Sequence, residues 1–175
     1  MLKTGLVHVY TGDGKGKTTA ALGQGLRSAG RGLKVCMVQF LKTNDTGELH
    51  ACKQLGDRFE IFRFENKRDF FWKLSEQEKQ ALKDEVHQAF EFITQAAGQC
   101  DILIMDEILG AIHNNLIEVQ QVCDFIRCKP HHLEVILTGR NAPACIVELA
   151  DYVSEIACVK HPIEQGIAAR EGIEY

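Results

Sequence analysis

Three closely spaced glycines, two lysines and two adjacent threonines occur together near the start of the chain, in the stretch TGDGKGKTTAALG at residues 11–23. Leu6, Val7 and Val9 precede the stretch and are typical of a buried strand, and its alanines and leucine are typical of a helix. A strand that turns through glycines into a helix directs backbone N–H groups and the positive helix end at one point. The pattern therefore predicts a phosphate-binding loop (P-loop) for a nucleoside triphosphate.

Within this loop, Lys17 is expected to reach the outer phosphates and the Thr18 hydroxyl to ligate Mg²⁺. The general P-loop pattern has a glycine where this chain has Thr11, so we expect Gly12 and Gly14 to form the tight bends. The alternative, a glycine-rich turn that only happens to contain lysines, does not explain the strand before it and the helix after it. The candidate nucleotide contacts are Gly12, Asp13, Gly14, Lys15, Gly16, Lys17, Thr18 and Thr19.

Asp106 and Glu107 follow a run of four apolar residues, ILIM at 102–105. Many buried strands end in an acid, so this string alone is weak. Downstream of a P-loop, however, it predicts that a strand delivers an acid beside the phosphates, where Thr18, Asp106 and Glu107 are the candidate Mg²⁺ ligands. Arg140 is the only arginine in a clear strand-end loop. An ATPase motor or a small-molecule kinase usually needs more arginines or a coupling element, so neither pattern is well met.

Apolar strand-like runs alternate with helical patterns along the whole chain. We expect strands at 34–40, 59–64, 101–106, 133–138 and 152–159 besides the one before the P-loop. We expect helices at 50–56, 75–97 and 116–127 and from about residue 143, with Ser75 and Glu78 forming a capping box. This order predicts one α/β domain over residues 1–175, a P-loop NTPase-like (RecA-like) fold with a mostly parallel sheet and helices on both faces. Ligands of such sheets bind at the carboxyl ends of the strands.

The composition narrows the class of protein. The 175 residues are 45% hydrophobic and carry a formal net charge of −4, which argues against a nucleic-acid partner. No leader-like segment opens the chain and no apolar run approaches membrane-spanning length, so we expect a cytoplasmic protein without a membrane partner. Seven cysteines, none in C-x-x-C spacing, argue against a disulfide framework or a zinc site. We interpret His131 and His132 as a surface or strand-edge pair rather than a metal site.

The set of motifs resembles the P-loop ATP:corrinoid adenosyltransferases. The matching stretches are TGDGKGKTTAALG at 11–23, VQFLK at 38–42 with Gly47-Glu48, ILIMDEI at 102–108, LTGRNAP at 137–143, ELADYVSEI at 148–156 and KHPIEQGIAAREGIEY at 160–175. They cover nearly the whole chain, and the last is far more specific than a P-loop. Thr11 fits as well, because the loop of this family also lacks the first glycine.

The resemblance implies that a Co(I) corrinoid attacks the 5′ carbon of ATP and that triphosphate leaves. It implies ATP, Mg²⁺ and a corrinoid as ligands, a flavoprotein reductant, and commonly a homodimer. Lys17, Thr18 and Glu107 are then the expected catalytic residues, and Arg140 is an expected ATP contact. The alternatives are a small-molecule kinase or NTPase, and a nucleotide-gated binding module. The residues do not say which corrinoid is the substrate.

Two further segments carry expectations. Phe70, Phe71 and Trp72 are candidates for a hydrophobic wall against the corrin; the alternative is a loop that tucks these rings into the core, and Phe62 and Phe64 are rivals for the role. The tail at 161–175 lacks helical periodicity, yet we expect it to be ordered over the nucleotide or corrin site rather than a solvated terminus.

Overall fold

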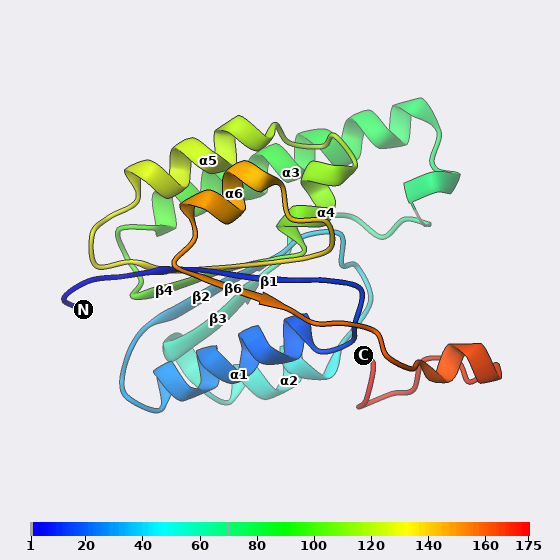
Figure 1. Ribbon diagram of the computed structural model, residues 1–175, viewed down its shortest axis with the longest axis horizontal. Coiled ribbons are helices and arrows are strands. Elements are labelled where there is room, and N and C mark those ends of the chain that lie inside the picture. The colour runs from blue at the N-terminus through cyan, green and yellow to red at the C-terminus, as the bar shows by residue number, and fades with distance from the viewer. Residues whose placement is uncertain (1, 70) are drawn as a thin grey trace.

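The computed structural model describes residues 2–69 and 71–175, in which a twisted β-sheet lies between two layers of helices (Figure 1). Every pair of neighbouring strands in this sheet is parallel, and the order is β3-β2-β4-β5-β1-β6. The strands are β1 (Val7–Thr11), β2 (Val35–Gln39), β3 (Phe59–Phe62), β4 (Ile102–Asp106), β5 (Glu134–Thr138) and β6 (Tyr152–Glu155). The expected α/β fold is therefore confirmed.

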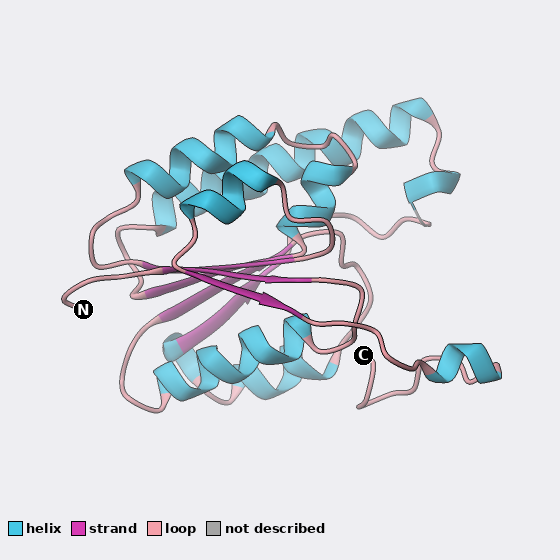
Figure 2. Cartoon of the chain, in the orientation of Figure 1, coloured by secondary structure: helices cyan, strands magenta, loops and turns pink. Residues whose placement is uncertain are grey.

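The helices divide between the two faces of the sheet, as Figure 2 shows. One face carries α1 (Lys17–Ala29) and α2 (Gly47–Lys53). The other carries α3 (Glu76–Ala96), α4 (Ile108–His113), α5 (Val119–Cys128) and α6 (Ala144–Leu149). Short 3₁₀ turns occupy Gly56–Arg58, Phe71–Lys73 and Pro162–Gln165. Two apolar clusters follow from this division, the larger one beneath α3 to α6 and the smaller one beneath α1 and α2.

The central strands β2 and β4 are buried at every position, which their nearly continuous apolar sequences, VCMVQ and ILIMD, require. By contrast, β6 is an edge strand exposed at all four positions. Helix α3 begins with the expected capping box, in which Ser75 and Glu78 bond each other's backbone N–H groups. The polar residues that end β2 and β4, Gln39 and Asp106, are therefore held at neighbouring register positions at the carboxyl edge of the sheet.

Several expected boundaries were wrong. The second helix spans Gly47–Lys53 and begins three residues before the expected 50–56, directly after the extended N-cap residue Thr46. The expected helix at 116–127 begins at Val119, and the separate helix α4 was not expected. The last strand ends at Glu155 instead of continuing to residue 159, because the chain leaves the sheet edge beside the P-loop.

Candidate functional site

The P-loop connects β1 directly to α1. Gly12 and Gly16 have φ values of 99° and 122°, which residues with a Cβ rarely adopt, and Gly16 caps the helix that begins at Lys17. A Cβ on Gly12 would lie 2.5 Å from the Ile156 carbonyl oxygen, and one on Gly14 would lie 2.6 Å from that of Ala157. The segment after β6 therefore packs directly against the loop and requires glycine at both positions.

Thr11 explains why the first P-loop glycine is dispensable here. It is the last residue of β1 and pairs with Glu155 of β6, so the chain is still extended at this position. Its hydroxyl also accepts a hydrogen bond from the Ala142 N–H across 3.3 Å. Of the two glycines expected to form the tight bends, Gly12 has a positive φ and Gly14 does not.

Lys17 lies folded over its own loop. Its ammonium donates to the carbonyl oxygens of Gly12 and Gly14, across 2.7 and 2.8 Å. Burial lowers the pKa of Lys17, and the nearby carboxylates of Glu107, Asp13 and Asp106 oppose that shift. The charge is thus held at the mouth of the loop, bonded to carbonyl oxygens that a phosphate oxygen can replace.

Asp106 ends β4 with a fully buried carboxylate that accepts four hydrogen bonds. Oδ1 accepts from the Thr18 hydroxyl at 2.8 Å and from the Thr138 hydroxyl at 2.7 Å. Oδ2 accepts from Lys42 Nζ at 2.8 Å and from Gln39 Nε2 at 3.2 Å. Strands β2, β4 and β5 and helix α1 therefore meet at one carboxylate.

Glu107 follows in the left-handed conformation, with φ 63°, and its N–H donates to the Thr138 hydroxyl. A Cβ placed on Gly110 would lie 2.7 Å from Glu107 Oε1, so the carboxylate lies against the first turn of α4. Burial, followed by the charge of Asp106, raises the pKa of Glu107, and Lys17 and Lys42 oppose that rise. The strain and the raised pKa mark this carboxylate as a functional candidate.

A cavity of about 690 Å³, here named the P-loop cavity, opens over this cluster. The sequence-predicted residues Asp13, Gly14, Lys15, Gly16, Lys17, Thr18, Thr19, Glu107 and Arg140 all line it. Buried Asp106 lies beneath it, and Gly12 lies behind it in contact with the segment after β6. Arg140 is largely exposed and lies 3.5 Å from the exposed carboxylate of Asp13.

The donor set at Thr18 and Asp106 fits a hard divalent cation. The Thr18 hydroxyl donates its hydrogen to Asp106 and accepts a hydrogen bond from Lys42 Nζ at 3.4 Å, which leaves one lone pair of its oxygen for a metal ion. Among residues 2–69 and 71–175, no group of three or more His, Cys, Asp or Glu side chains could hold a metal ion. Mg²⁺ at nucleotide sites takes one or two protein oxygens and completes its shell with phosphate and water. Such a three-residue group is therefore not required.

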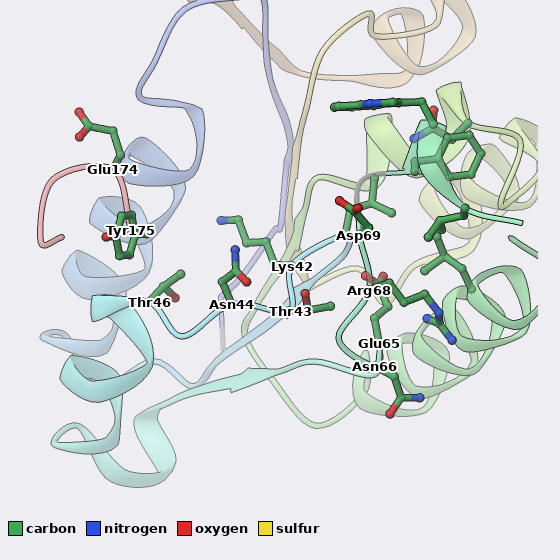
Figure 3. Close-up of a pocket in the computed structure, with 16 residues that line it drawn as sticks. Lys42, Thr43, Asn44, Thr46, Glu65, Asn66, Arg68, Asp69, Glu174 and Tyr175 are labelled. Atoms are coloured by element: carbon green, nitrogen blue, oxygen red, sulfur yellow. The ribbon is translucent and has the colours of Figure 1, made fainter. Parts of the chain in front are cut away.

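A second cavity of about 550 Å³, here named the aromatic cavity, lies beside the first and is shown in Figure 3. Trp72 is 75% exposed on its wall, whereas Phe71 also packs against the main core. Phe62 and Phe64 line neither cavity, and both rings pack at a tilt against Phe92. Phe70 lies outside the described residues.

The two cavities share part of their walls: Lys42, Thr46, Glu174 and Tyr175 line both. In Figure 3, Lys42 lies between Glu174 and Tyr175 on one side and Asp69 on the other. The tail thus reaches back to the site, and His161, Gly172 and Ile173 also line the P-loop cavity. A nucleotide in one cavity and a second molecule in the other would be in reach of each other.

Comparisons with known proteins identify the family to which the chain belongs. The model of the family described as ATP:corrinoid adenosyltransferase BtuR/CobO/CobP matches residues 3–175. The chain belongs to this family. It is 36% identical to "Corrinoid adenosyltransferase" of Escherichia coli (strain K12) over 173 residues, 98% of this chain and 86% of that protein. It is 33% identical to "Corrinoid adenosyltransferase CobA" of Salmonella typhimurium, over the same shares of the two chains. It is 31% identical to the Pseudomonas aeruginosa "Corrinoid adenosyltransferase", over 98% of this chain and 84% of that one.

In this member of the ATP:corrinoid adenosyltransferase family, the site also contains three residues that were not among the candidates predicted from the sequence. They are Gln39, Lys42 and Thr138. Gln39 and Thr138 each end a buried strand, so a polar residue after an apolar run was the available signal. Lys42 lies three residues beyond β2, and only the fold brings it to Asp106. Arg63 extends the cluster, donating to Gln39 Oε1 at 2.8 Å and to the Thr46 hydroxyl at 2.7 Å.

One carboxyl of the aromatic cavity is unusual. Glu65 Oε1 is buried without a hydrogen-bond partner, and burial raises the pKa of Glu65 to about 7. Elsewhere, the seven cysteines are free thiols, and His131 and His132 lie in the turn before β5. No helix within the described ranges combines the length and the apolar character needed to cross a bilayer.

Proposed function

We propose that this chain, as one P-loop domain over residues 1–175, transfers the 5′-deoxyadenosyl group of ATP to the cobalt of a Co(I) corrinoid. The observation that carries the proposal is the shared wall of the two cavities. The P-loop cavity suits a triphosphate, and an adjoining cavity with an exposed indole suits the flat, apolar face of a macrocycle. The family match over residues 3–175 supports this assignment.

In this reaction the cobalt electron pair forms a Co–C bond to the 5′ carbon, and the C–O bond breaks with its electrons passing to triphosphate. Co(I) is itself a strong nucleophile, so the protein need not supply a general base. Its task is to align the reacting atoms and to stabilise charge on the leaving group. Lys15 and Lys17 line the P-loop cavity, and α1 begins at Lys17, which supports this role for them.

Thr18, Asp106 and Glu107 are the residues proposed to hold Mg²⁺, which would supply positive charge to the leaving triphosphate. Thr18 offers one lone pair of its hydroxyl oxygen, because its hydrogen is used on Asp106. Asp106 orients that hydroxyl, and Glu107 presents a partly buried carboxylate to the same cavity. Gly12, Asp13, Gly14, Gly16, Thr19 and Arg140 complete the proposed ATP contacts.

Phe71 and Trp72, with Phe70 beside them in the chain, are the proposed corrinoid contacts. A ring against the lower face of cobalt would keep water away, which favours the four-coordinate metal and eases its reduction. Because the reaction needs Co(I), we also propose a flavoprotein that supplies the electron. A homodimer and a cytoplasmic setting complete the proposal; the exposed apolar side chains Tyr152 and Val153 on edge strand β6 are consistent with a second copy.

Product analysis tests the proposal. Incubated with Mg·ATP and a chemically reduced Co(I) corrinoid, the protein should release triphosphate and form a light-sensitive Co–C bond in equal amounts. With ATP alone, or with the Co(III) corrinoid, it should release neither triphosphate nor ADP. Formation of ADP without a corrinoid would instead assign a kinase or NTPase, and binding without any product would assign a nucleotide-gated binding module.

A further inference from the structure

Lys42 is a cation of the site that the P-loop pattern does not account for. Its Nζ lies 2.8 Å from Asp106 Oδ2, 3.4 Å from the Thr18 hydroxyl oxygen and 3.8 Å from Glu48 Oε1. Its side chain is only 27% exposed, and that of Asp106 is fully buried. This contact is therefore an ion pair withdrawn from water, where a partner of opposite charge matters most.

Asp106 depends on this partner for charge balance. Its other hydrogen-bond donors, Thr18, Thr138 and Gln39, are neutral. A carboxylate buried without a compensating cation is strongly unfavourable. Lys42 therefore neutralises Asp106 in the arrangement that the structure describes.

The atoms that Lys42 contacts are those expected to surround the metal ion. Thr18 Oγ1 and the Asp106 carboxylate are at the same time the contacts of the ammonium and part of the proposed Mg²⁺ site. A dication at these oxygens would lie within a few ångströms of the ammonium, in a partly buried place where screening is weak. The two cations repel each other, so an ammonium held at these oxygens opposes the binding of a dication to them.

The Lys42 ammonium could occupy a second position, near the aromatic cavity. It lies in the shared wall of the two cavities, and its long flexible stem lets the ammonium turn without a change in the backbone. The lining of the aromatic cavity also includes Asp69 and Glu174, acidic residues that are paired with the exposed cations Lys73 and Arg170. A displaced ammonium would thus find solvent and acidic groups on the corrinoid side.

We propose that Lys42 is the resident counter-ion of Asp106 before substrate binds, and that Mg²⁺ arriving with the triphosphate displaces its ammonium toward the aromatic cavity. Lys42 is a positioning residue in this scheme: it keeps Asp106 and Thr18 in place while the metal ion is absent. The inference rests on the Mg²⁺ site of the proposed function. Its consequence is that Lys42 opposes metal binding, which is the reverse of what an ordinary structural or ligating residue does.

The test measures Mn²⁺ binding to the nucleotide-free protein by electron paramagnetic resonance, without corrinoid and without turnover. Lys42→Met removes the charge at similar length, and Lys42→Gln keeps a hydrogen-bond donor without the charge. Lys42→Arg keeps the charge, and Lys53→Met removes an exposed lysine from α2 as a control. We expect Lys42→Met and Lys42→Gln to bind Mn²⁺ at least tenfold more tightly than the wild type, and the other two variants to match it.

Thermal unfolding with and without Mg²⁺ gives a second readout. The uncharged variants should unfold at lower temperature than the wild type when metal-free, because Asp106 is then unpaired, and Mg²⁺ should restore more of their stability. If folded Lys42→Gln and Lys42→Met bind Mn²⁺ no more tightly than the wild type, or bind none, the proposal is wrong. A different experiment decides the proposed function, namely whether the wild-type protein transfers the adenosyl group.

Discussion

The Thr18 hydroxyl donates to Asp106 Oδ1 across 2.8 Å and so joins the first turn of α1 to the end of β4, 88 positions further along the chain. The contact places the hydroxyl and the buried carboxylate in the relative positions that a metal ion on the phosphates needs. Thr138, Gln39 and Lys42 also donate to Asp106, so several elements hold this carboxylate in one orientation. Preorganised polar groups of this kind cost little reorganisation during reaction.

Replacement of Lys17 by alanine should remove most of the activity. The ammonium is the charge nearest the centre of the loop, where it is bonded to the carbonyl oxygens of Gly12 and Gly14. We expect kcat/KM for ATP to fall by roughly 100- to 1,000-fold, the usual loss when a donor to a developing negative charge is removed. Steady-state kinetics with excess Co(I) corrinoid measure this, with Lys53→Ala as the exposed-lysine control. Unchanged kinetics in a folded Lys17→Ala protein would contradict the assignment of the loop.

Glu107→Gln should raise the Mg²⁺ concentration needed for half-maximal activity. The substitution keeps the shape of the side chain but removes the negative charge that faces Lys17 and the P-loop cavity. We expect an increase of roughly tenfold or more, or a loss of turnover. A Mg²⁺ titration at saturating ATP measures it, with the exposed Glu171→Gln as control. The same Mg²⁺ dependence in variant and wild type would remove Glu107 from the metal site.

Glu65 should make the stability of the protein depend on pH. Burial raises its pKa from 4.5 to about 7, so between these values the folded protein retains a proton that the unfolded chain releases. This favourable contribution is complete below pH 4.5 and is lost as the pH rises through 7. Glu65→Gln cannot ionise, so its free energy of unfolding relative to the wild type should rise over this interval, by up to about 3 kcal/mol. Urea unfolding at pH 5, 6, 7 and 8 measures the difference, which should not change for Glu171→Gln.

Alanine substitutions at Trp72 and Phe71 should show whether each ring contributes to activity or to the stability of the core. Trp72 is largely exposed, so Trp72→Ala should change the free energy of unfolding by less than about 0.5 kcal/mol. Phe71 packs on the core, so Phe71→Ala should cost about 2 kcal/mol. If the indole shields cobalt, Trp72→Ala should slow transfer from a Co(II) corrinoid with a flavoprotein reductant more than transfer from chemically reduced Co(I), and Trp72→Phe should recover part of the loss. Equal losses in the two assays would make Trp72 a general corrinoid contact.

Deletion of residues 161–175 should weaken the binding of both substrates. The tail contributes His161, Gly172, Ile173, Glu174 and Tyr175 to the P-loop cavity, and the last two also line the aromatic cavity. We expect the KM values for ATP and for the corrinoid to rise roughly tenfold each, a loss of about 1.4 kcal/mol per ligand. Ile163→Ala is the matched control, because Ile163 is exposed in the tail and lines neither cavity. Wild-type kinetics in the folded truncated protein would mean that the tail has no role in the site.

The parts of the site that are continuous in the chain could be predicted from the sequence. The P-loop at residues 12–19 is one turn between one strand and one helix, so its glycines and lysines identify it without the fold. The ILIMD run likewise identifies a buried strand with an acid at its end. Local hydrogen bonding and apolar periodicity decide such features, and both can be read along a single stretch. The boundaries of the helix at 47–53 and of the strand that ends at Glu155 could not be predicted in this way, because packing between elements sets them.

Only the tertiary structure decided which distant side chains meet. Lys42 and Asp106 are 64 positions apart, and Thr138 reaches Asp106 from the neighbouring strand β5. The need for glycine at positions 12 and 14 arises from the carbonyl oxygens of Ile156 and Ala157, which no local pattern contains. These contacts depend on the order and register of parallel strands, and a shift of one residue would turn each side chain to the other face of the sheet. The sequence alone therefore determined the loop and its chemistry, whereas strand register decided which charge balances Asp106 and which cavity adjoins the P-loop.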